Sequence, residues 1–511
     1  MSFFQVLTDK VSSKIRLPSE EITTQSSMAM SDPPLHMSAI KRPRVLHIAH
    51  GIPSYNNSLV EMARRLVAAD IDLYVACHVD LSEVLQESPA KFIELRADTD
   101  IMNLHTEALQ KINGCNKAVR AWKRVVLNRK YKLISLGLTE IADHIKSIEP
   151  DLLLIDMECH VAIVQTLNCK ISTVLCSRWF SVFKARGIPP MHTIMQPAKN
   201  PFQLCHVALA WQKLRIYKLG LDLKLRLSRR RFWPINYNSN GRFDLESLAR
   251  QQGVKLSRHT DRSHWLIPHI YSDYPVMSLT MKELEFGEKG DERMHYVGPM
   301  IGAGNTINTQ FPAAESKLHT FIERNNQSIK KPLIYCSFST FWSTETENYQ
   351  ALSRLFFKRP DLDFVIGLGG NEVPDALADL PENALTMQFA PQIEILKFAT
   401  IAITHGGIST INESLYHGVP LIVCSSGHVD QNGCAARVAY HGAGVVANSK
   451  PLSEDEIERL IDQLLDYETV ETSGKNCHPE TLQQRVSVLS NRMREMQAQG
   501  TAELFIKSQI G

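Results

Sequence analysis

The chain has 511 residues, of which 44% are hydrophobic and 22% are charged, and its formal net charge is +2. This composition is typical of a folded globular protein and excludes a disordered or fibrous one. A net charge so close to zero also excludes a field that would recruit nucleic acid. Because single hydrophobic cores stop growing near about 250–300 residues, we expect two domains of similar size.

The cysteines and the amino-terminal segment indicate an intracellular protein. The ten cysteines show no paired short spacing of the kind found in zinc knuckles or redox motifs, which favours a reduced cytoplasm. Lys10, Lys14 and Glu20 interrupt what would have to be the apolar core of a secretory signal. No run approaches the roughly 18 apolar residues of a membrane span. We therefore expect a soluble, cytoplasmic protein with a flexible leader over residues 1–40, which are rich in Ser, Thr, Pro and Met.

Strands and helices begin to alternate shortly after this leader. Apolar residues at 59, 62, 63 and 66 have helical spacing, and a second helical pattern ends near residue 150. Strands that alternate with helices predict a parallel sheet with right-handed crossovers, here in a first domain over residues 41–300. The expected strands are the apolar runs at 45–49, 72–78, 92–95 and 151–156.

The pattern weakens between residues 178 and 265, where aromatic residues such as Trp179, Trp211 and Trp233 mix with basic ones. Two interpretations stay open, a subregion that faces an acceptor and a peripheral helical excursion. A basic run in this segment is either a solvated helix face or a contact with a membrane that holds a lipophilic acceptor. Its members are Lys224, Arg226, Arg229, Arg230 and Arg231.

A second alternating series follows a polar, glycine-containing linker at residues 301–312. We expect a second domain over 313–485 with strands at 332–338, 363–368, 399–404 and 420–424, then helices from about residue 453. The glycines of 367–370 indicate a strand-end turn, because the spacing and the following helix of a dinucleotide-binding motif are lacking. The fold class is therefore α/β, with two doubly wound Rossmann-like domains that face a central cleft.

The densest chemical pattern lies between residues 388 and 431. The strand at 399–404 ends at His405, two glycines follow, and Ser409 and Thr410 open a helix. A helix amino terminus presents unpaired N–H groups and about half a positive charge, which suits a diphosphate. Glu413 lies one turn further in, where a carboxylate can accept both hydroxyls of a ribose. Taken alone, the His-Gly-Gly sequence favours a tight strand-to-helix turn without a ligand.

The whole stretch resembles the nucleotide-sugar signature of the UDP-glycosyltransferase superfamily. That pattern runs from aromatic-x-Pro-Gln through His-x-Gly, a helix with Glu, and Gly-Val-Pro to Asp-Gln, and each part occurs here in order between Phe389 and Gln431. The resemblance implies a GT-B fold similar to the macrolide-, sterol- and carotenoid-type glucosyltransferases of bacteria and fungi. It also implies that the final segment, residues 486–511, packs back on the first domain.

The resemblance also assigns roles to single residues. Phe389 lies at the uracil face, Gln392 bonds the base, Glu413 holds the ribose, His405 and Thr410 grip the phosphates, and Asp430 and Gln431 bond the hydroxyls of a glucose-type sugar. A second phosphate loop follows the first strand of this domain, with Ser339 where glycine is usual. The expected donor site comprises Ser339, Thr340, Phe389, Ala390, Gln392, His405, Gly407, Ser409, Thr410, Glu413, Asp430 and Gln431.

The catalytic base is the point at which the sequence departs from the family. Tyr55 stands where the resemblance calls for a histidine, and a tyrosine with a pKa of about 10 is a poor base at neutral pH. Asp156 matches the partner carboxylate. His50, with an ordinary pKa of about 6.5, is the alternative base, and Asp156 itself is a third candidate. Glu158 and His160 follow closely and either line the same loop or cap a helix.

The leading hypothesis is an inverting transferase that moves a hexose, with glucose favoured, from a UDP-sugar to a hydroxyl of a small apolar or lipid-like acceptor. It needs no metal and no cofactor, because the helix dipole, His405 and Thr410 stabilise the leaving diphosphate. The alternative is a catalytically impaired UDP-sugar-binding homologue or a UDP-sugar hydrolase, since Tyr55 replaces the usual base. A sugar-nucleotide epimerase is a third interpretation, but it leaves the aromatic segment at 178–265 unexplained.

Overall fold

The computed structural model divides the chain into two compact units, residues 1–41 and 42–511. The described residues are 42–86, 88–95, 107–108, 110–112, 116, 118–120, 122–123, 126–127, 140–227, 242–261, 270–287, 291–302, 312–327, 331–337, 346–427, 430–449, 451–466 and 481–510. The expected leader lies outside these residues, as do residues 303–311 of the expected linker.

The first sheet is parallel throughout, as the alternation of strands and helices predicts. Its strand order, β3-β2-β1-β4-β5-β8-β9, runs in both directions from β1. Ile48, at the end of β1, pairs with Ala76 on one side and with Ile155 on the other, so these three strands end together. The strands are β1 (Arg44–Ile48), β2 (Asp72–Cys77), β3 (Lys91–Glu94), β4 (Leu152–Asp156), β5 (Ser172–Ser177), β8 (Val276–Ser278) and β9 (Met294–Tyr296).

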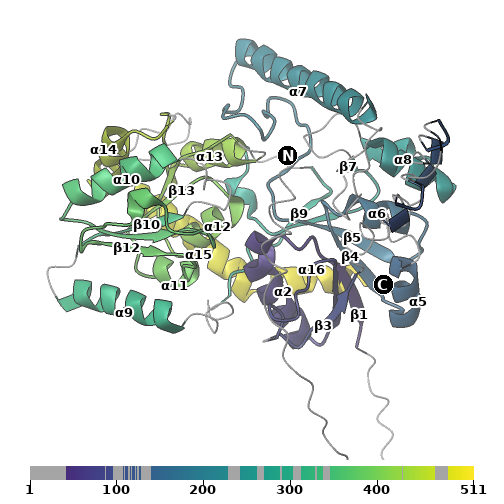
Figure 1. Ribbon diagram of the computed structural model, residues 1–511, viewed down its shortest axis with the longest axis horizontal. Helices are drawn as coiled ribbons and strands as arrows, with labels where there is room; N and C mark the ends of the chain where they lie inside the picture. Colours follow the sequence, from purple (N-terminus) through teal and green to yellow (C-terminus); the bar gives the residue numbers. More distant parts are fainter. Residues whose placement is uncertain are drawn as a thin grey trace, which may run out of the picture. The chain divides into compact units, whose positions relative to one another are not determined.

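Helices flank this sheet, and their buried stripes explain where they form. In α2 (Asn56–Ala68) the predicted helical positions Leu59, Met62, Ala63 and Leu66 are all buried. The remaining helices of this part are α5 (Glu140–Ile148), α6 (His160–Thr166), α7 (Pro201–Leu227) and α8 (Arg242–Gln251), drawn in Figure 1. Short elements complete it: η1 (Pro53–Tyr55), η3 (Leu256–Arg258), η4 (Lys282–Leu284) and the antiparallel pair β6 (Thr260–Asp261) and β7 (Ile270–Tyr271).

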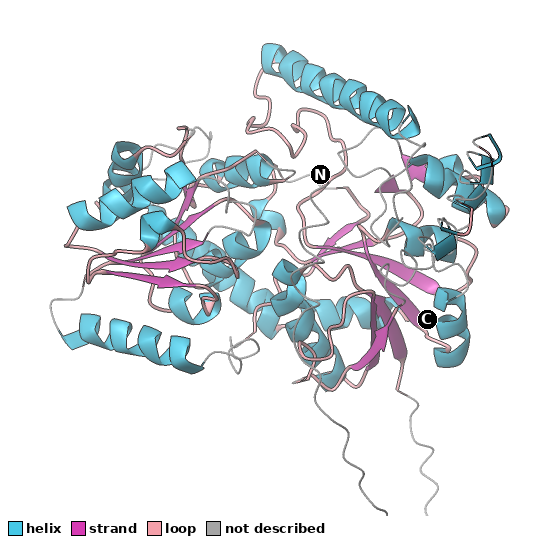
Figure 2. Cartoon of the chain, in the orientation of Figure 1, coloured by secondary structure: helices cyan, strands magenta, loops and turns pink. Residues whose placement is uncertain are grey.

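The second sheet repeats the design with the order β12-β11-β10-β13-β14-β15, again parallel at every pairing. Figure 2 shows its strands as a group separate from those of the first sheet. The strands are β10 (Leu333–Ser337), β11 (Asp363–Gly367), β12 (Ala384–Met387), β13 (Ile401–Thr404), β14 (Leu421–Val423) and β15 (Gly444–Val446). The helices are α9 (Pro312–Gln327), α10 (Thr346–Lys358), α11 (Gln392–Leu396), α12 (Ile408–Tyr416), α13 (Gln431–Tyr440) and α14 (Glu454–Leu465), with the short η6 (Asp375–Leu377).

Two helices at the carboxyl end connect the two sheets. Helix α15 (Leu482–Ala498) begins at a capping box and hydrogen-bonds α12, since Ser490 Oγ donates to the carbonyl of Tyr416 at 2.7 Å. Gly500 then adopts a left-handed φ of 65°, which reverses the chain into α16 (Thr501–Gln509). Ala502 and Ile506 of α16 are buried in the same apolar cluster as strand β1.

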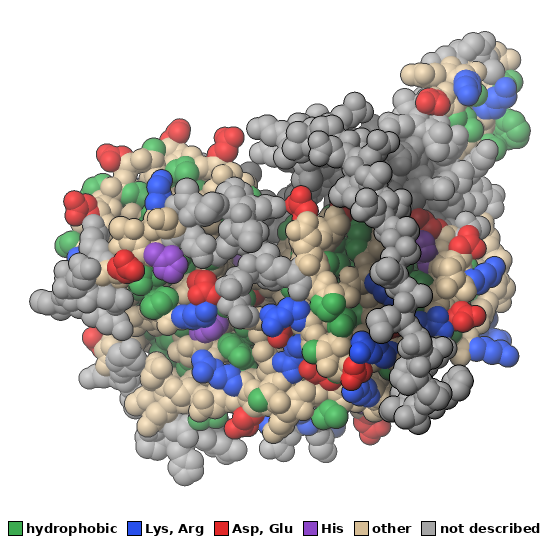
Figure 3. Space-filling view, turned by 90° about the horizontal axis from the view of Figure 1, so that it is seen from below, with side chains coloured by type: hydrophobic (Ala, Val, Ile, Leu, Met, Phe, Trp, Pro, Cys, Tyr) green, Lys and Arg blue, Asp and Glu red, His purple; other side chains and the backbone are tan. Residues whose placement is uncertain are grey.

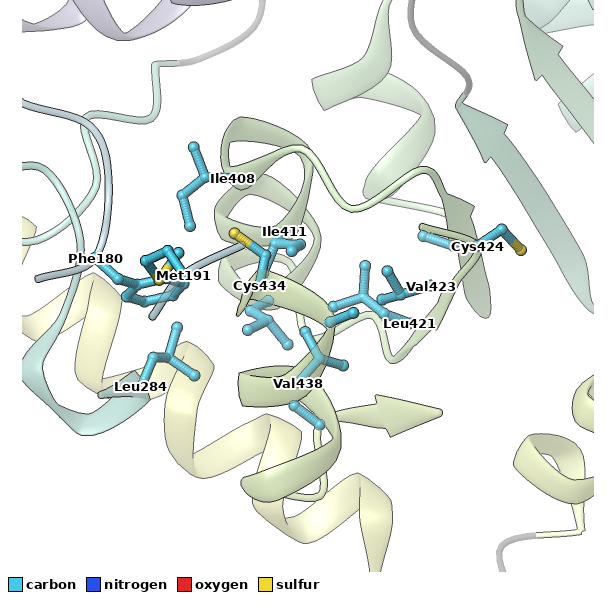
Figure 4. Close-up of a cluster of buried hydrophobic side chains, with 14 of the residues drawn as sticks. Phe180, Met191, Leu284, Ile408, Ile411, Leu421, Val423, Cys424, Cys434 and Val438 are labelled. Carbon is cyan, nitrogen blue, oxygen red and sulfur yellow. The ribbon is translucent and has the colours of Figure 1, made fainter. Parts of the chain in front are cut away.

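Apolar side chains also join the two halves directly. Figure 4 shows Phe180, Met191 and Leu284 beside Ile408, Ile411, Cys434 and Val438 of α12 and α13, and all of these residues belong to one buried cluster. A buried ion pair lies next to it, because Arg437 Nη2 is 2.7 Å from Glu285 Oε2. The carboxyl-end loops of the two sheets therefore meet in a packed interface.

The architecture confirms the predicted fold class, two doubly wound parallel α/β sheets. The structure contains every predicted strand, and no strand end differs from its prediction by more than two residues. The predicted ranges were 45–49, 72–78, 92–95, 151–156, 332–338, 363–368, 399–404 and 420–424. Strands β5, β8, β9, β12 and β15 were not predicted, and of these β5 has six residues, β12 four and the others three. Among the helices of the described residues, none combines the length and the apolar character that crossing a bilayer would need.

Basic and acidic side chains alternate over the face of the molecule shown in Figure 3. This mixture agrees with the near-zero net charge of the sequence. That face therefore offers no extended surface of a single sign.

Candidate active site

The loop between β13 and α12 is built around two glycines. Gly406 has a φ of +93°, and a Cβ on it would lie 3.0 Å from Val423 Cγ1 and 3.3 Å from the carbonyl oxygen of Gln431. A Cβ on Gly407 would lie 2.8 Å from His405 Nε2. Neither position accepts a side chain without a shift, so both glycines are needed for the backbone to turn this tightly beside His405.

His405 is oriented by the neighbouring strand. Its Nδ1 lies 3.4 Å from the carbonyl oxygen of Ser337, and a carbonyl can only accept, so Nδ1 carries the proton. The other ring nitrogen, Nε2, then faces Gly407, where α12 begins. No side chain caps this helix, so its first amide groups are available to an anion.

Gln392 and Glu413 form the centre of a polar network at this edge of the second sheet. Gln392 Oε1 accepts hydrogen bonds from the hydroxyls of Tyr335 at 3.1 Å and Ser337 at 2.9 Å. Its Nε2 donates to Glu413 Oε2 and lies 3.4 Å from Thr410 Oγ1. Burial raises the pKa of Glu413 above its ordinary value.

Residues of the first half reach into this network. Asn57 Nδ2 donates to Glu413 Oε1 at 3.4 Å, and Ser409 Oγ donates to the carbonyl of Ser54 at 3.2 Å. A small cavity lies where the two halves meet. Its polar lining includes Ser54, Ser58, Arg178, Ser409, Asn412 and Glu413, and its apolar lining is Leu279, Pro299, Met300, Ile301 and Ile408.

The remaining predicted donor residues lie around the same edge. The ring of Phe389 is 42% exposed and packs on Gly370, where a Cβ would meet the ring at 3.0 Å, and Ala390 packs on Gly367 in the same way. Gln431 is buried, and its Oε1 accepts a hydrogen bond from Ser426 Oγ at 2.7 Å.

Asp430 precedes α13, and burial raises the pKa of its carboxyl to about 6. Asp430 also acts electrostatically on Tyr55 of the first half. Ser339 and Thr340, the predicted second phosphate loop, lie outside the described residues.

Asp156, at the end of β4, has partners for both of its carboxylate oxygens. Oδ1 lies 3.0 Å from His47 Nε2, while Oδ2 accepts the backbone N–H of His50 at 2.8 Å and pairs with Arg178 Nη1 at 2.8 Å. Burial alone would raise the pKa of Asp156, but Arg178 and His47 outweigh it and hold that pKa well below its ordinary value. This carboxylate is a firmly held anion.

His50 meets Asp156 through its backbone and not through its imidazole. Burial lowers the pKa of His50 to about 4, so the ring is neutral and only weakly basic near pH 7. The imidazole that contacts Asp156 belongs to His47, which is fully buried within β1.

Tyr55, in the position of the expected base, is 7% exposed and ends η1. Its hydroxyl donates to Glu158 Oε1 at 3.0 Å, and the guanidinium of Arg178 stacks on its ring with Cζ 4.2 Å from the centroid. Burial, with Glu158 nearby, raises the pKa of Tyr55 well above its ordinary value. Tyr55 is therefore neutral at physiological pH.

Glu158 also belongs to this cluster, although the sequence predicted for it only a place in the loop or at a helix cap. It lies two residues beyond Asp156 in the loop that follows β4, and burial followed by repulsion from Asp156 raises its pKa to about 7. The sequence placed it in this loop but could not show that Tyr55, more than one hundred residues earlier, donates to it. His160, in contrast, lies in α6 with Nδ1 3.2 Å from the Tyr271 hydroxyl.

The fold and this loop arrangement define the protein as one with a GT-B architecture. A solved glycosyltransferase of kitacinnamycin superposes on it with a TM-score of 0.61 at 16% identity, covering 92% of this chain and all of that one. Residues 345–492 match the model of the glycosyltransferase family 28 C-terminal domain. The matched segment includes β13, α12 and α13.

Two curated relatives align with parts of the chain. The protein named Uncharacterized UDP-glucosyltransferase YojK, from Bacillus subtilis (strain 168), is 29% identical over 188 residues, which cover 37% of this chain and 43% of the relative. Zeaxanthin glucosyltransferase of Pantoea ananas is 27% identical over 204 residues, which cover 39% of this chain and 44% of the relative. The aligned segments span less than half the length of these relatives.

Proposed function

We propose that this protein is an inverting glycosyltransferase that moves a hexose from a UDP-sugar to a hydroxyl group of a small apolar acceptor. The observation that carries the proposal is the uncapped amino terminus of α12 with the imidazole of His405 beside it and Glu413 one turn further along. Free amide groups, a ring nitrogen and a carboxylate at these spacings are complementary to a diphosphate followed by a ribose.

In the proposed mechanism, α12 and His405 bind the diphosphate and take up the charge that it gains on leaving. Since the proton of His405 Nδ1 is directed to the carbonyl of Ser337, Nε2 donates to a phosphate oxygen only when the ring is cationic. A bound diphosphate favours that cation. These groups would replace a metal ion as the electrostatic stabiliser, and we expect transfer to persist in EDTA.

The sugar and base preferences are inferred from the other residues of the network. Gln392 is positioned by Tyr335 and Ser337 for hydrogen bonds to a pyrimidine, and the exposed Phe389 ring offers a stacking face. The Asp430-Gln431 pair favours a glucose-type sugar. The names of the relatives, a UDP-glucosyltransferase and a zeaxanthin glucosyltransferase, support UDP-glucose as the first donor to try.

An apolar acceptor is favoured by the cavity between the two halves. Its wall includes Leu279, Met300 and Ile301 from the first half and Ile408 from the second. Such a lining contributes about 25 cal/mol per Å² of apolar surface that an acceptor buries there. The polar groups at its rim, Arg178 and Ser58, then orient the reacting hydroxyl.

The test is the rate of UDP release from UDP-glucose with and without a panel of apolar alcohols and phenols. The proposal predicts release that depends on the acceptor, with a β-glucoside as product. The second candidate, a UDP-sugar-binding homologue or hydrolase, is favoured by Tyr55 in the base position, and it predicts UDP binding with at most slow release that no acceptor accelerates. Absence of UDP binding would rule out both.

We also propose that α7 contacts an anionic membrane surface from which a lipophilic acceptor is drawn. At about 100° per residue, Phe202, Leu209, Ile216 and Leu223 form one stripe along the helix, and they are 70%, 57%, 69% and 56% exposed. The buried residues Val207, Trp211 and Leu214 occupy the opposite side.

Exposed Lys213 and Arg215 flank this apolar stripe, one on each side, as in helices that lie in a membrane interface. Co-sedimentation with vesicles that contain phosphatidylserine should exceed that with neutral vesicles and should fall in Ile216→Glu. Val488→Glu, a change at a valine of α15 that is 60% exposed, is the control. Unchanged sedimentation of Ile216→Glu, or self-association through this stripe in place of vesicle binding, would exclude the membrane role.

A further inference from the structure

Tyr55, Glu158 and Arg178 form a compact cluster at the carboxyl edge of the first sheet. The Tyr55 hydroxyl donates to Glu158 Oε1 at 3.0 Å. The guanidinium of Arg178 stacks over the tyrosine ring, with Cζ 4.2 Å from the ring centroid. Arg178 also forms an ion pair with Asp156 at 2.8 Å and lines the cavity between the two halves. The cluster therefore adjoins the place where an acceptor would bind.

The two carboxylates of this cluster are unequally compensated. Asp156 has the guanidinium of Arg178, the imidazole of His47 and the amide of His50. Glu158 has only neutral donors, the Tyr55 hydroxyl and its own backbone amide, and its Oε2 is buried without a hydrogen bond to another described residue. A proton that enters the cluster will therefore bind to Glu158 and leave Asp156 ionised.

We propose that Tyr55 and Glu158 form a proton relay that replaces the family's histidine, with the Tyr55 hydroxyl touching the acceptor and Glu158 receiving the proton. This inference rests on the transferase proposed above and names the base of that same site. The relay differs from the two alternative bases that the sequence suggested, because neither His50 nor Asp156 takes the proton.

The relay balances in one step. The acceptor hydroxyl transfers its proton to the Tyr55 oxygen while the proton of Tyr55 moves to Glu158 Oε1, and the acceptor oxygen forms a bond to the anomeric carbon. The bond from that carbon to the diphosphate oxygen breaks, and the diphosphate leaves with the electron pair towards His405 and α12. Tyr55 is neutral before and after the step, so its high pKa is no obstacle.

The charges around the cluster suit this direction of transfer. Burial and the charge of Asp156 raise the pKa of Glu158 to about 7, the range in which a general base is most effective near neutral pH. The charged groups that face the pair are Asp156 and Arg178 from the first half and Asp430, which acts on Tyr55. The thiols of Cys159 and Cys176 lie near Glu158, and burial keeps both protonated.

The experiment compares wild type, Tyr55→Phe and Glu158→Gln by kcat/KM for the acceptor between pH 5 and 9. Wild type should rise through a midpoint of about 7 as Glu158 loses its proton. Both variants should lose about 100-fold or more of the plateau rate, and Glu158→Gln should lose the rising limb, while both keep the UDP affinity of wild type. Glu94→Gln, the same change on an exposed residue of β3, is the control.

A Glu158→Gln variant with the rate and the rising limb of wild type would overturn the relay, as would full activity in Tyr55→Phe. If Glu158→Gln does not fold, Glu158→Asp takes its place in the experiment. A shift in the pH midpoint of its kcat/KM supports the relay, and an unchanged midpoint overturns it. The proposed function fails separately, when wild type itself shows no acceptor-dependent UDP release.

A stability measurement gives a second readout. Because the folded chain holds the Glu158 proton more tightly than the unfolded chain, stability should fall as pH rises from about 4.5 to about 7 and then level off. The free energy of unfolding of Glu158→Gln minus that of wild type should increase as pH rises over this window. A flat difference would contradict the raised proton affinity on which the relay depends.

Discussion

The two halves of the candidate site are built from different kinds of sequence information. In the donor half, His405, Glu413 and Gln431 follow one another along a single stretch that forms β13, α12 and the start of α13. In the acceptor half, Tyr55 ends η1, Asp156 ends β4 and Arg178 follows β5, so the three residues come from separate segments of the chain. A local motif fixes the geometry of the first, whereas the second depends on which side chains meet after folding.

The two halves differ in how readily substitutions can alter the chemistry of the site. The donor half keeps two glycines that accept no side chain and an amide network in which Gln392 bonds four partners. In the proposed acceptor half, Tyr55 stands where the family resemblance calls for a histidine, and it contacts Arg178 and a second carboxylate, Glu158. We expect variants in the first to lose donor binding and variants in the second to change the proton transfer.

The largest effect is expected where the two halves are joined. Glu285 is buried, pairs with Arg437 at 2.7 Å and accepts the Tyr296 hydroxyl at 3.0 Å. Glu285→Ala leaves a buried cation without its partner and should cost about 3–5 kcal/mol of unfolding free energy in urea titrations. Glu283→Ala removes an exposed pair with Arg492 and should cost less than about 1 kcal/mol. Equal losses would mean that the buried pair does not hold the halves together.

The next effect should be confined to the donor half. His405→Ala removes the ring that faces the start of α12 and should lower kcat/KM for UDP-glucose by about 100-fold, in the range found for a lost oxyanion-type donor. Circular dichroism and the unfolding midpoint should stay close to those of wild type. His319→Ala, on the exposed face of α9, is the matched control. Turnover at the wild-type rate would remove the phosphate role of His405.

A smaller and more selective effect is expected at Glu413. Glu413→Gln should weaken UDP by about 10-fold in calorimetry, because a charged acceptor of ribose hydroxyl hydrogen bonds becomes neutral. The same substitution should weaken the binding of 2′-deoxy-UDP by a smaller factor, since that nucleotide lacks one of the two ribose hydroxyls. Glu394→Gln, on the neighbouring helix α11 and paired with Lys397, should leave both affinities unchanged. Equal losses for the two nucleotides would place Glu413 away from the ribose.

Sequence patterns predicted eight of the strands and their parallel arrangement, because periodicity and turn chemistry act over short distances. The runs at 151–156 and 399–404 became β4 and β13, both fully buried. The strands that were not predicted, such as β8 and β15, have three residues each, too few for a clear alternation.

The acceptor half could be predicted only in part, for the same physical reason. Asp156 was identified by its position at the end of a strand, but its pairing with Arg178 and His47 depends on tertiary contacts. The hydrogen bond from Tyr55 to Glu158 joins residues far apart in the chain, and no local pattern records it.

The measurement that tests the account most directly is hydrogen–deuterium exchange with and without saturating UDP. The account predicts that amide groups from His405 to Ile411, which begin α12, exchange more slowly when UDP is bound, and that His405→Ala reduces this protection. UDP that binds with protection elsewhere and none at these amides would contradict the donor site on which every other assignment rests.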